Sequence, residues 1–292
     1  MPAVAGAREP LGNTHGFGAL AWKRLRWDPV LLGALGVILM VVGASMLAPR
    51  LAPYDPTHVD PRIRLWPPGT VGHLLGTDQL GRDVLSRVLW GGRISLIVGI
   101  VPVVLSALGG IVVGLIAGYY GGFVDHVITR SLDVLFAFPA ILLALAIVSA
   151  LGPSIYNAML AITIVAVPSF ARLVRSSVLS VRERSFVEAA RSLGANNERI
   201  ILRHILPNTA SPVIVYGTFE TGKTIVFAAA LSFLGLGVQP PTAEWGAMLS
   251  QGRSVLATAW HVATIPGIVI FLVSLSFNIL GDGLRDALDP HL

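Results

Sequence analysis

Long uncharged apolar runs divide the chain and predict helices that cross a membrane. The first run, residues 30–48, has 19 residues without a charge. As a helix it measures about 28 Å, enough to cross the hydrocarbon core of a bilayer. Residues 94–124 form a second run, in which we expect a span over residues 94–117. A third uncharged run covers residues 134–171 and would measure about 57 Å as one helix, nearly twice the thickness of that core.

Gly152 and Pro153 lie near the middle of the third run and form a strong helix-breaking pair. We therefore expect a hairpin, with one span ending near residue 151 and the next beginning near residue 155. Further spans are expected at residues 209–234 and 262–280, which predicts an all-α integral membrane protein with six transmembrane helices. Residues 30–48 could instead be a cleaved signal peptide, but their length and the later spans favour a retained anchor.

The segments between these runs have patterns of their own. Residues 49–93 begin rich in proline and should be extended there, whereas the spacing of Leu85, Val88 and Leu89 predicts a helix on the membrane surface. Residues 125–133 predict a short polar turn. The expected division is a cytoplasmic tail at 1–29, a first transmembrane helix at 30–48, an extracytoplasmic segment at 49–93, a five-helix core at 94–281 and a cytoplasmic tail at 282–292. This topology places 13 Lys and Arg residues inside and 7 outside, in agreement with the positive-inside rule.

A polar stretch, residues 185–207, lies between the fourth and fifth spans. Ser185 and Glu188 have the spacing of a capping box, so a helix should begin at Ser185. Gly194 can end that helix in a left-handed conformation. The helix would be about 12 Å long, too short to be stable alone.

Phe186, Ala190 and Leu193 form an apolar face on this first helix. That face could pack on the protein's own bundle, or it could fit a groove on a partner. Asn196 or Asn197 can cap a second helix, which we expect Pro207 to stop.

Composition supports the membrane interpretation and excludes several chemistries. The chain is 54% hydrophobic and 13% charged, against about 25% charged in a typical soluble domain. It has no cysteine and its histidines are scattered, so we expect no metal site. The absence of Walker A, HExxH and GxSxG sequences predicts no ATPase site and no catalytic residues in this chain. The net charge of +5 is spread between apolar runs, a pattern that does not predict binding to nucleic acid.

Glu220 and Lys223 are two charges in the middle of the fifth predicted span. Their spacing places them on one helical face, and charges at this depth usually mark a cavity or a partner interface. They could form an ion pair buried against a companion subunit. Alternatively, they could line a translocation path and meet a charged substrate.

The polar stretch resembles the EAA motif of bacterial ABC-importer permeases. The string EAARSLG begins at Glu188, and Leu206 with Pro207 match the motif's final Leu-Pro. In that family this loop docks on a cytoplasmic ATPase, so the resemblance implies a type I importer permease with a cytoplasmic coupling helix. The residues it assigns to coupling are Ser185, Glu188, Ala189, Ala190, Gly194, Leu206 and Pro207.

Two other blocks resemble the dipeptide, oligopeptide and nickel branch of these permeases. They are GTDQLGRDVLSRV, which begins at Gly76, and LSFLGLGVQPP, which begins at Leu231. The resemblance identifies the chain as a C-type subunit in a bacterial or archaeal plasma membrane, with both termini cytoplasmic. It implies a homologous second permease, two ATPase subunits that bind ATP and magnesium, and an extracytoplasmic solute-binding protein, while this chain binds no cofactor.

The solute class is not set by these motifs. Di- and oligopeptides are the main expectation, and nickel chelates, glutathione or another small solute are alternatives within the same machinery. An ion-driven secondary transporter, a membrane enzyme and a membrane scaffold are rival interpretations. The two-helix stretch favours the ATP-driven importer over an ion-driven transporter, whereas a scaffold would keep this stretch but show no solute flux.

Overall fold

The computed structural model describes residues 28–288, and within them the chain is helical apart from loops and two isolated bridges. The principal elements are α2 (Pro29–Met46), α3 (Ala48–Leu51), α4 (Val84–Tyr120), α5 (Gly122–Phe136), α6 (Ala140–Leu151), α7 (Ile155–Arg182), α8 (Ser185–Ser192), α9 (Asn197–Ile200), the π-helix η2 (Ile201–Ile205), α10 (Leu206–Phe233), α11 (Trp245–Gly252) and α12 (His261–Leu288). Short 3-10 turns cover Pro61–Ile63 and Arg253–Val255.

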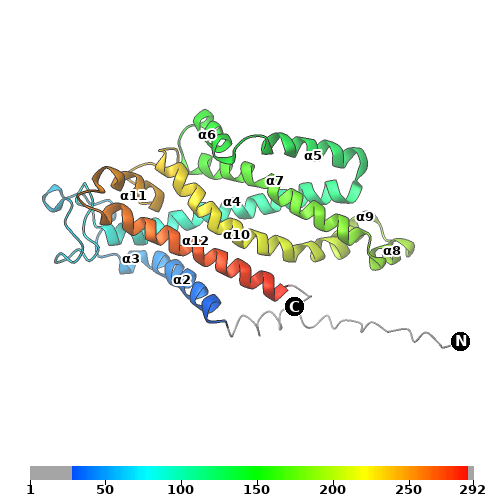
Figure 1. Ribbon diagram of the computed structural model, residues 1–292, viewed down its shortest axis with the longest axis horizontal. Coiled ribbons are helices and arrows are strands. Elements are labelled where there is room, and N and C mark those ends of the chain that lie inside the picture. Colours follow the sequence, from blue (N-terminus) through cyan, green and yellow to red (C-terminus); the bar gives the residue numbers. More distant parts are fainter. Residues whose placement is uncertain (1–27, 289–292) are drawn as a thin grey trace.

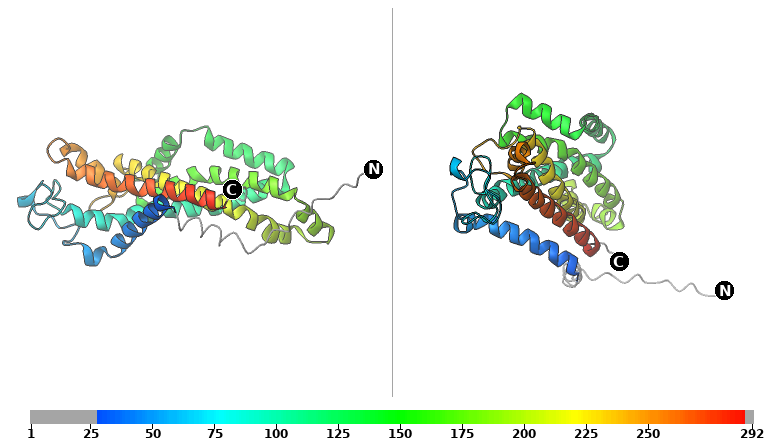
Figure 2. Two further views of the ribbon diagram at one scale, coloured as in Figure 1. Left: turned by 60° about the horizontal axis from the view of Figure 1, so that its bottom comes forward. Right: turned by 60° about the vertical axis from the view of Figure 1, so that its left-hand side comes forward.

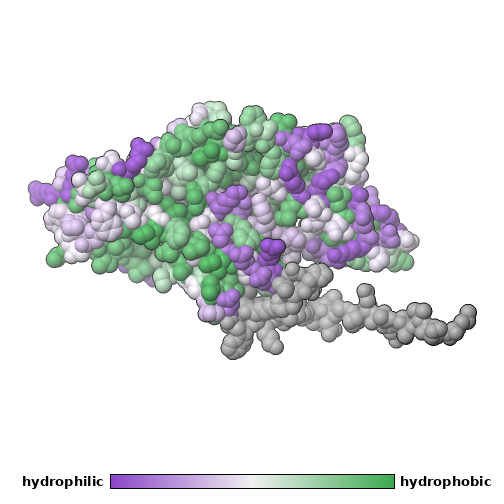
Figure 3. Space-filling view, in the orientation of Figure 1, coloured by the Kyte–Doolittle hydropathy of each residue, from purple (hydrophilic) through white to green (hydrophobic). Residues whose placement is uncertain are grey.

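Four long helices, α4, α7, α10 and α12, form an elongated bundle, with α2 beside α4 and α12 (Figure 1, Figure 2). The segment before α4 and helix α11 lie at one end of this bundle, and α8 with α9 lie at the other. Apolar side chains cover the middle of the molecule, and polar ones gather over the end that carries α8 and α9 (Figure 3). This distribution fits a bundle whose middle faces lipid.

Within residues 28–288, the helices α2, α4, α7 and α12 are each long and apolar enough to cross a membrane. The pair α5 and α6 raises the number of spans to five if it is counted as one bent span. Helix α10 has 28 residues, as many as α7, but it carries Glu220 and Lys223 near its middle and is not among these spans. The all-α membrane fold is therefore confirmed. By length and apolarity, however, residues 28–288 contain four or five spans rather than the predicted six.

The predicted surface helix near residue 85 is wrong. Residues 84–93 are the first turns of α4, which continues for 37 residues. Asp83 begins this helix, since its carboxylate accepts the backbone N–H of Ser86 at 2.7 Å, and no residue breaks the helix between Trp90 and Ile94. The long helix also contains Pro102.

The predicted polar turn at residues 125–133 is also wrong, because these residues lie in the 15-residue helix α5. Helix α6 follows it after a bend of 86°. The third predicted span is therefore broken rather than straight, and α6 has only 12 residues. The predicted break at Gly152 and Pro153 is present, because α6 ends at Leu151 and α7 begins at Ile155.

Helices α4 and α7 pack closely through three glycines on one face of α4. A methyl group added at Gly110 would lie 2.8 Å from the backbone nitrogen of Ala171, and one added at Gly114 would lie 2.6 Å from the carbonyl oxygen of the same residue. At Gly118 it would lie 2.8 Å from Cβ of Val178. This four-residue spacing of glycines allows two membrane helices to approach backbone to backbone.

Buried charged side chains hold the segment before α4 against its end of the bundle. Arg82 donates a hydrogen bond to Asp78 at 2.7 Å, and His73 pairs with Asp83 at 2.9 Å. All four side chains are buried. Charges removed from water in this way require such partners, so these pairs fix the path of a segment that has no long helix of its own.

Candidate functional site

Helices α8 and α9 form a two-helix arm at the polar end of the bundle, and Gly194 makes its corner. Gly194 has φ +83°. Its N–H donates to the carbonyl of Arg191 at 3.0 Å, and the N–H of Ala195 donates to the carbonyl of Ala190 at 3.1 Å. These two bonds make a Schellman motif, so the predicted role of Gly194 in ending the first helix is correct.

Asn196 caps the second arm helix, as one of the two predicted possibilities. Its side chain accepts the backbone N–H of Arg199 at 2.9 Å. The capping box predicted at the first arm helix is not formed. Arg184 occupies the cap position in an extended conformation, and Ser185 is already the first helical residue. The cause is the short turn after α7, in which the carbonyl of Arg184 receives the first helical bond from Val187.

Pro207 does not stop the second arm helix, contrary to the prediction. The chain passes from α9 through the π-helix η2 into α10 without a break. The N–H of Leu206 donates to the carbonyl of Ile201, five residues back, and the wider turn accommodates a proline that has no N–H of its own. The Asn208 side chain donates to the carbonyl of His204 at 2.6 Å.

The arm is anchored to the bundle by apolar residues, and its outer face is exposed. Val187, Ile200 and Ile205 are fully buried in a cluster with the valines of α7. In contrast, Phe186 is 39% exposed and Leu193 is 88% exposed. The apolar face predicted for the first arm helix therefore lies largely outside the bundle. Val187, which the helical spacing did not single out, makes the internal contact instead.

Five of the residues assigned to coupling lie on this arm, and the other two, Leu206 and Pro207, begin α10. They do not all lie on one surface. Ala190 and Leu206 are half-buried, and Leu206 packs against the bundle cluster. The others, Ser185, Glu188, Ala189, Gly194 and Pro207, are exposed.

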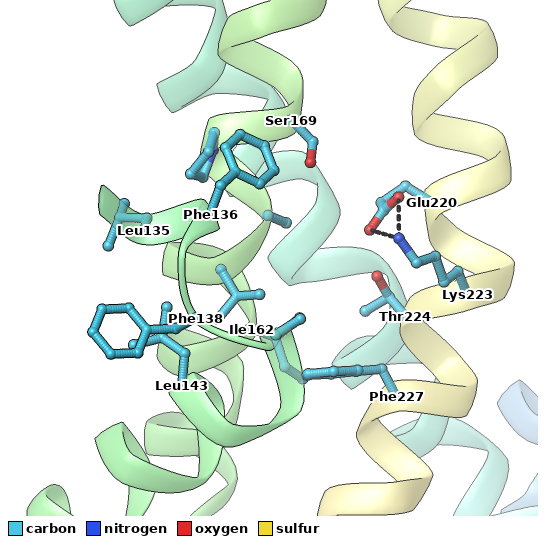
Figure 4. A pocket seen from close by; sticks show the side chains of 14 residues that line it. Leu135, Phe136, Phe138, Leu143, Ile162, Ser169, Glu220, Lys223, Thr224 and Phe227 are labelled. Carbon is cyan, nitrogen blue, oxygen red and sulfur yellow. Dashed lines mark hydrogen bonds and ion pairs between the residues drawn. The ribbon is translucent and has the colours of Figure 1, made fainter. Parts of the chain in front are cut away.

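Glu220 and Lys223 line a cavity of about 180 Å³ between the α5–α6 corner, α7 and α10 (Figure 4). The ammonium of Lys223 lies 3.5 Å from each carboxylate oxygen of Glu220. Ser169 of α7 and Thr224 of α10 add hydroxyl groups to the lining. The remaining lining residues are apolar: Leu135, Phe136, Phe138, Ala140, Leu143, Ile162, Val165, Ala166, Pro168 and Phe227.

Two walls of the cavity are direct continuations of the arm. Helix α7 carries Ser169 and ends 13 residues later at Arg182, just before the arm. Helix α10 begins at Leu206 without a break from the arm and carries Glu220. Each path is about 20 Å of helix, so a movement of the arm can reach the cavity through two rigid elements.

Helix α5 forms the third wall, and α7 holds it mainly by polar contacts. No residue of α5 is buried. Arg175 donates to both carboxylate oxygens of Asp125, at 2.5 and 2.6 Å. Arg172 pairs with Asp133 at 3.3 Å and lies 4.1 Å above the ring of Phe136. Arginines of α7 therefore set the position of a helix whose last residue lines the cavity.

Replacing Arg175 with glutamine should loosen α5 from α7. A partly exposed bidentate pair contributes about 1 kcal/mol, so amide hydrogen exchange in α5 should accelerate roughly fivefold. The Arg175→Lys variant keeps the charge and should show a smaller change. Hydrogen exchange followed by mass spectrometry measures both. Unchanged protection of α5 in Arg175→Gln would show that other contacts hold this helix.

Among residues 28–288, no group of three or more His, Asp or Glu side chains could hold a metal ion.

Residues 110–292 match the family model described as the binding-protein-dependent transport system inner membrane component. The chain belongs to this family. Residues 16–68 also match the N-terminal transmembrane domain of oligopeptide transport permease C.

Curated relatives of this permease are similar over nearly their whole length. It is 47% identical over 271 residues to the glutathione transport system permease protein GsiD of Pectobacterium atrosepticum, which covers 93% of this chain and 90% of the relative. The protein of the same name from Escherichia coli O6:K15:H31 is also 47% identical, over 93% of this chain and 89% of the relative.

Solved structures show the same fold at low sequence identity. The inward-facing MetNI methionine ABC transporter aligns with a TM-score of 0.57 and 18% identity, over 69% of this permease and 96% of that chain. An amino acid ABC transporter crystallised with histidines aligns with a TM-score of 0.51 and 18% identity, over 65% of this permease and 88% of that chain.

These comparisons confirm the importer permease inferred from the EAA resemblance and its peptide and oligopeptide branch. The protein is a multi-pass membrane protein and the transport subunit of an ABC importer, a subunit that is not itself catalytic.

Proposed function

We propose that this permease is one of two homologous membrane subunits of an ATP-driven importer that carries glutathione or another short peptide. The observation that supports this proposal most strongly is the 47% identity to permeases named for glutathione transport, over 93% of the chain. Glutathione is a tripeptide, so this substrate lies inside the peptide class that the sequence motifs favour. Di- and oligopeptides without the γ-linkage remain the second candidate, supported by the match to oligopeptide permease C.

The arm of α8 and α9 is the proposed docking element for the ATPase. Its exposed apolar residues, Phe186 and Leu193, are available to a partner, and Val187 and Ile200 tie its two helices to the bundle. Binding of ATP and magnesium by two ATPase subunits would favour one state of the bundle through this arm, and hydrolysis would release it. A solute-binding protein delivers the substrate on the opposite, extracytoplasmic side.

The topology proposed for this importer places the arm and both chain termini in the cytoplasm of a bacterial or archaeal cell. The arm lies at the polar end of the bundle (Figure 3). The predicted topology places 13 Lys and Arg residues on the side of the arm and 7 on the opposite side, in agreement with the positive-inside rule.

Co-purification of the tagged permease in mild detergent tests the docking. The wild type should bring down an ATPase and a second permease, whereas Glu188→Arg should lose the ATPase and keep the second permease. Glu188 is exposed in the first turn of α8, where a reversed charge costs the helix only about 1 kcal/mol or less. The matched control is Glu183→Arg, the same change at an exposed glutamate just outside the arm.

Recovery of the chain alone, both as wild type and as variant, would overturn the docking proposal.

Uptake of labelled glutathione by cells with the intact system tests the substrate. Uptake that continues when the ATPase is inactivated would instead support an ion-driven transporter.

A further inference from the structure

The cavity at Glu220 has a charged side and an apolar side. Glu220, Lys223 and Thr224 lie on α10, and Phe136 and Phe138 belong to the corner between α5 and α6 (Figure 4). A charge in a membrane helix is costly unless it is paired. The two α10 charges neutralise each other when the cavity holds no ligand.

The two partners of this ion pair differ in freedom. The side chain of Glu220 is 11% exposed, whereas that of Lys223 is 71% exposed. Their separation of 3.5 Å is longer than the 2.7–2.9 Å typical of a tight charge-assisted hydrogen bond. The pair is therefore loose, with a fixed carboxylate and an ammonium that can swing toward a ligand.

We propose that this pair binds the α-amino-acid head group of a ligand, in which an ammonium and a carboxylate share one carbon. The ligand's ammonium pairs with Glu220 and its carboxylate pairs with Lys223, so that four charges alternate around a small ring. The net charge of the site stays zero before and after binding. A ligand with only one of the two groups leaves one protein charge without its new partner.

The proposal rests on the proposed function, since glutathione has this head group. Its γ-linkage leaves the ammonium and the α-carboxylate of glutamate free, both attached to the same α-carbon. In an ordinary extended tripeptide the terminal charges lie roughly 10 Å apart. The cavity volume of about 180 Å³ is below the range of 300–1,000 Å³ for whole drug-sized ligands, which fits binding of one end of the molecule.

Two glutathione analogues separate the roles of the two charges. 4-Aminobutanoyl-cysteinylglycine keeps the ammonium and lacks the α-carboxylate. Glutaryl-cysteinylglycine keeps the carboxylate and lacks the ammonium. Uptake of each labelled compound is measured in cells that express the whole system with an unchanged solute-binding protein, so a change in selectivity between variants arises in the permease.

Wild type should take up glutathione at least about tenfold faster than either analogue, because each analogue leaves a charged group of the site unpaired. Lys223→Gln should lower glutathione uptake to the level of the aminobutanoyl analogue but should not lower uptake of that analogue, which lacks the group that pairs with Lys223. Glu220→Gln should lower glutathione uptake to the level of the glutaryl analogue but should not lower uptake of that analogue, which lacks the ammonium that pairs with Glu220. Lys223→Arg should retain the selectivity, and so should Thr218→Val, a change on α10 at a residue outside the cavity lining.

Four results would overturn the proposal. A parallel loss of all three compounds in Lys223→Gln and Glu220→Gln would indicate a structural role for the pair. Loss of the co-purified second permease would place the pair in a subunit interface. Unchanged selectivity in both variants would place recognition elsewhere. Failure of the wild type to take up glutathione would overturn the proposed substrate first, and this inference with it, whereas wild-type uptake with no change in the variants removes only the inference.

Discussion

Replacing Gly114 with leucine should prevent the permease from accumulating as a folded membrane protein. The new Cβ would lie 2.6 Å from the carbonyl oxygen of Ala171, 2.7 Å from Cβ of Val174 and 3.0 Å from the nitrogen of Arg175. Two of these atoms belong to the backbone of α7, so a side-chain rotation cannot relieve the contact. The two central helices would have to separate, at a cost of about 3 kcal/mol or more, a large part of the stability of an ordinary domain.

Separation of α4 and α7 would also disturb the cavity and the arm, because α7 links the two. The measurement is the amount of protein in the membrane fraction, followed by size-exclusion chromatography in detergent. Gly36→Leu is the matched control: Gly36 lies in α2, and nothing is within 4 Å of a Cβ added there. Equal amounts and equal elution of the two variants would show that α4 and α7 are not packed as closely as described.

The features that could be predicted from the sequence depend on neighbouring residues. Gly152 with Pro153 marks the turn between α6 and α7, and Gly194 marks the corner of the arm. Asn196 caps the helix that follows it. Each of these residues acts through its own backbone preference or through a hydrogen bond to a residue three positions away, so a short window of sequence contains the whole cause.

The features that were missed depend on contacts between distant segments. Helix α5 resembles a polar turn because Asp125 and Asp133 interrupt its apolar residues. In the folded protein, Arg175 and Arg172 pair with these carboxylates from 50 and 39 residues away. The same limit applies to Pro207, because the π-helix that precedes it is held by burial of Ile205 against the bundle.

The candidate site was predictable only in part for the same reason. The spacing of Glu220 and Lys223 predicted that they share a helical face, and the structure confirms their contact at 3.5 Å. No local pattern indicates that Phe136, Phe138 and Ser169 lie opposite them, since these residues come from other segments of the chain. The bend between α5 and α6 brings the two phenylalanines to the cavity.

Replacing Gly194 with valine should leave the permease in the membrane and abolish most of its transport. Nothing lies within 4 Å of a Cβ added at Gly194, so space is not the difficulty. The residue has φ +83°, a conformation that costs a non-glycine residue about 1–2 kcal/mol and a β-branched residue more. Because Val187 and Ile200 anchor the two arm helices separately, a change of backbone angle at the corner must move α8 relative to α9.

A graded series at this position separates backbone conformation from side-chain chemistry. Asparagine tolerates the left-handed region best among the larger residues, so Gly194→Asn should keep most of the uptake, Gly194→Ala less, and Gly194→Val under about a tenth, since each 1.4 kcal/mol corresponds to a factor of ten. Uptake is compared at equal amounts of membrane-inserted protein, with ATPase co-purification measured alongside. Full uptake in the valine variant would show that the corner does not transmit force. Uptake that falls in the order Asn, Ala, Val would show that the geometry of one backbone angle connects the arm to the transport path.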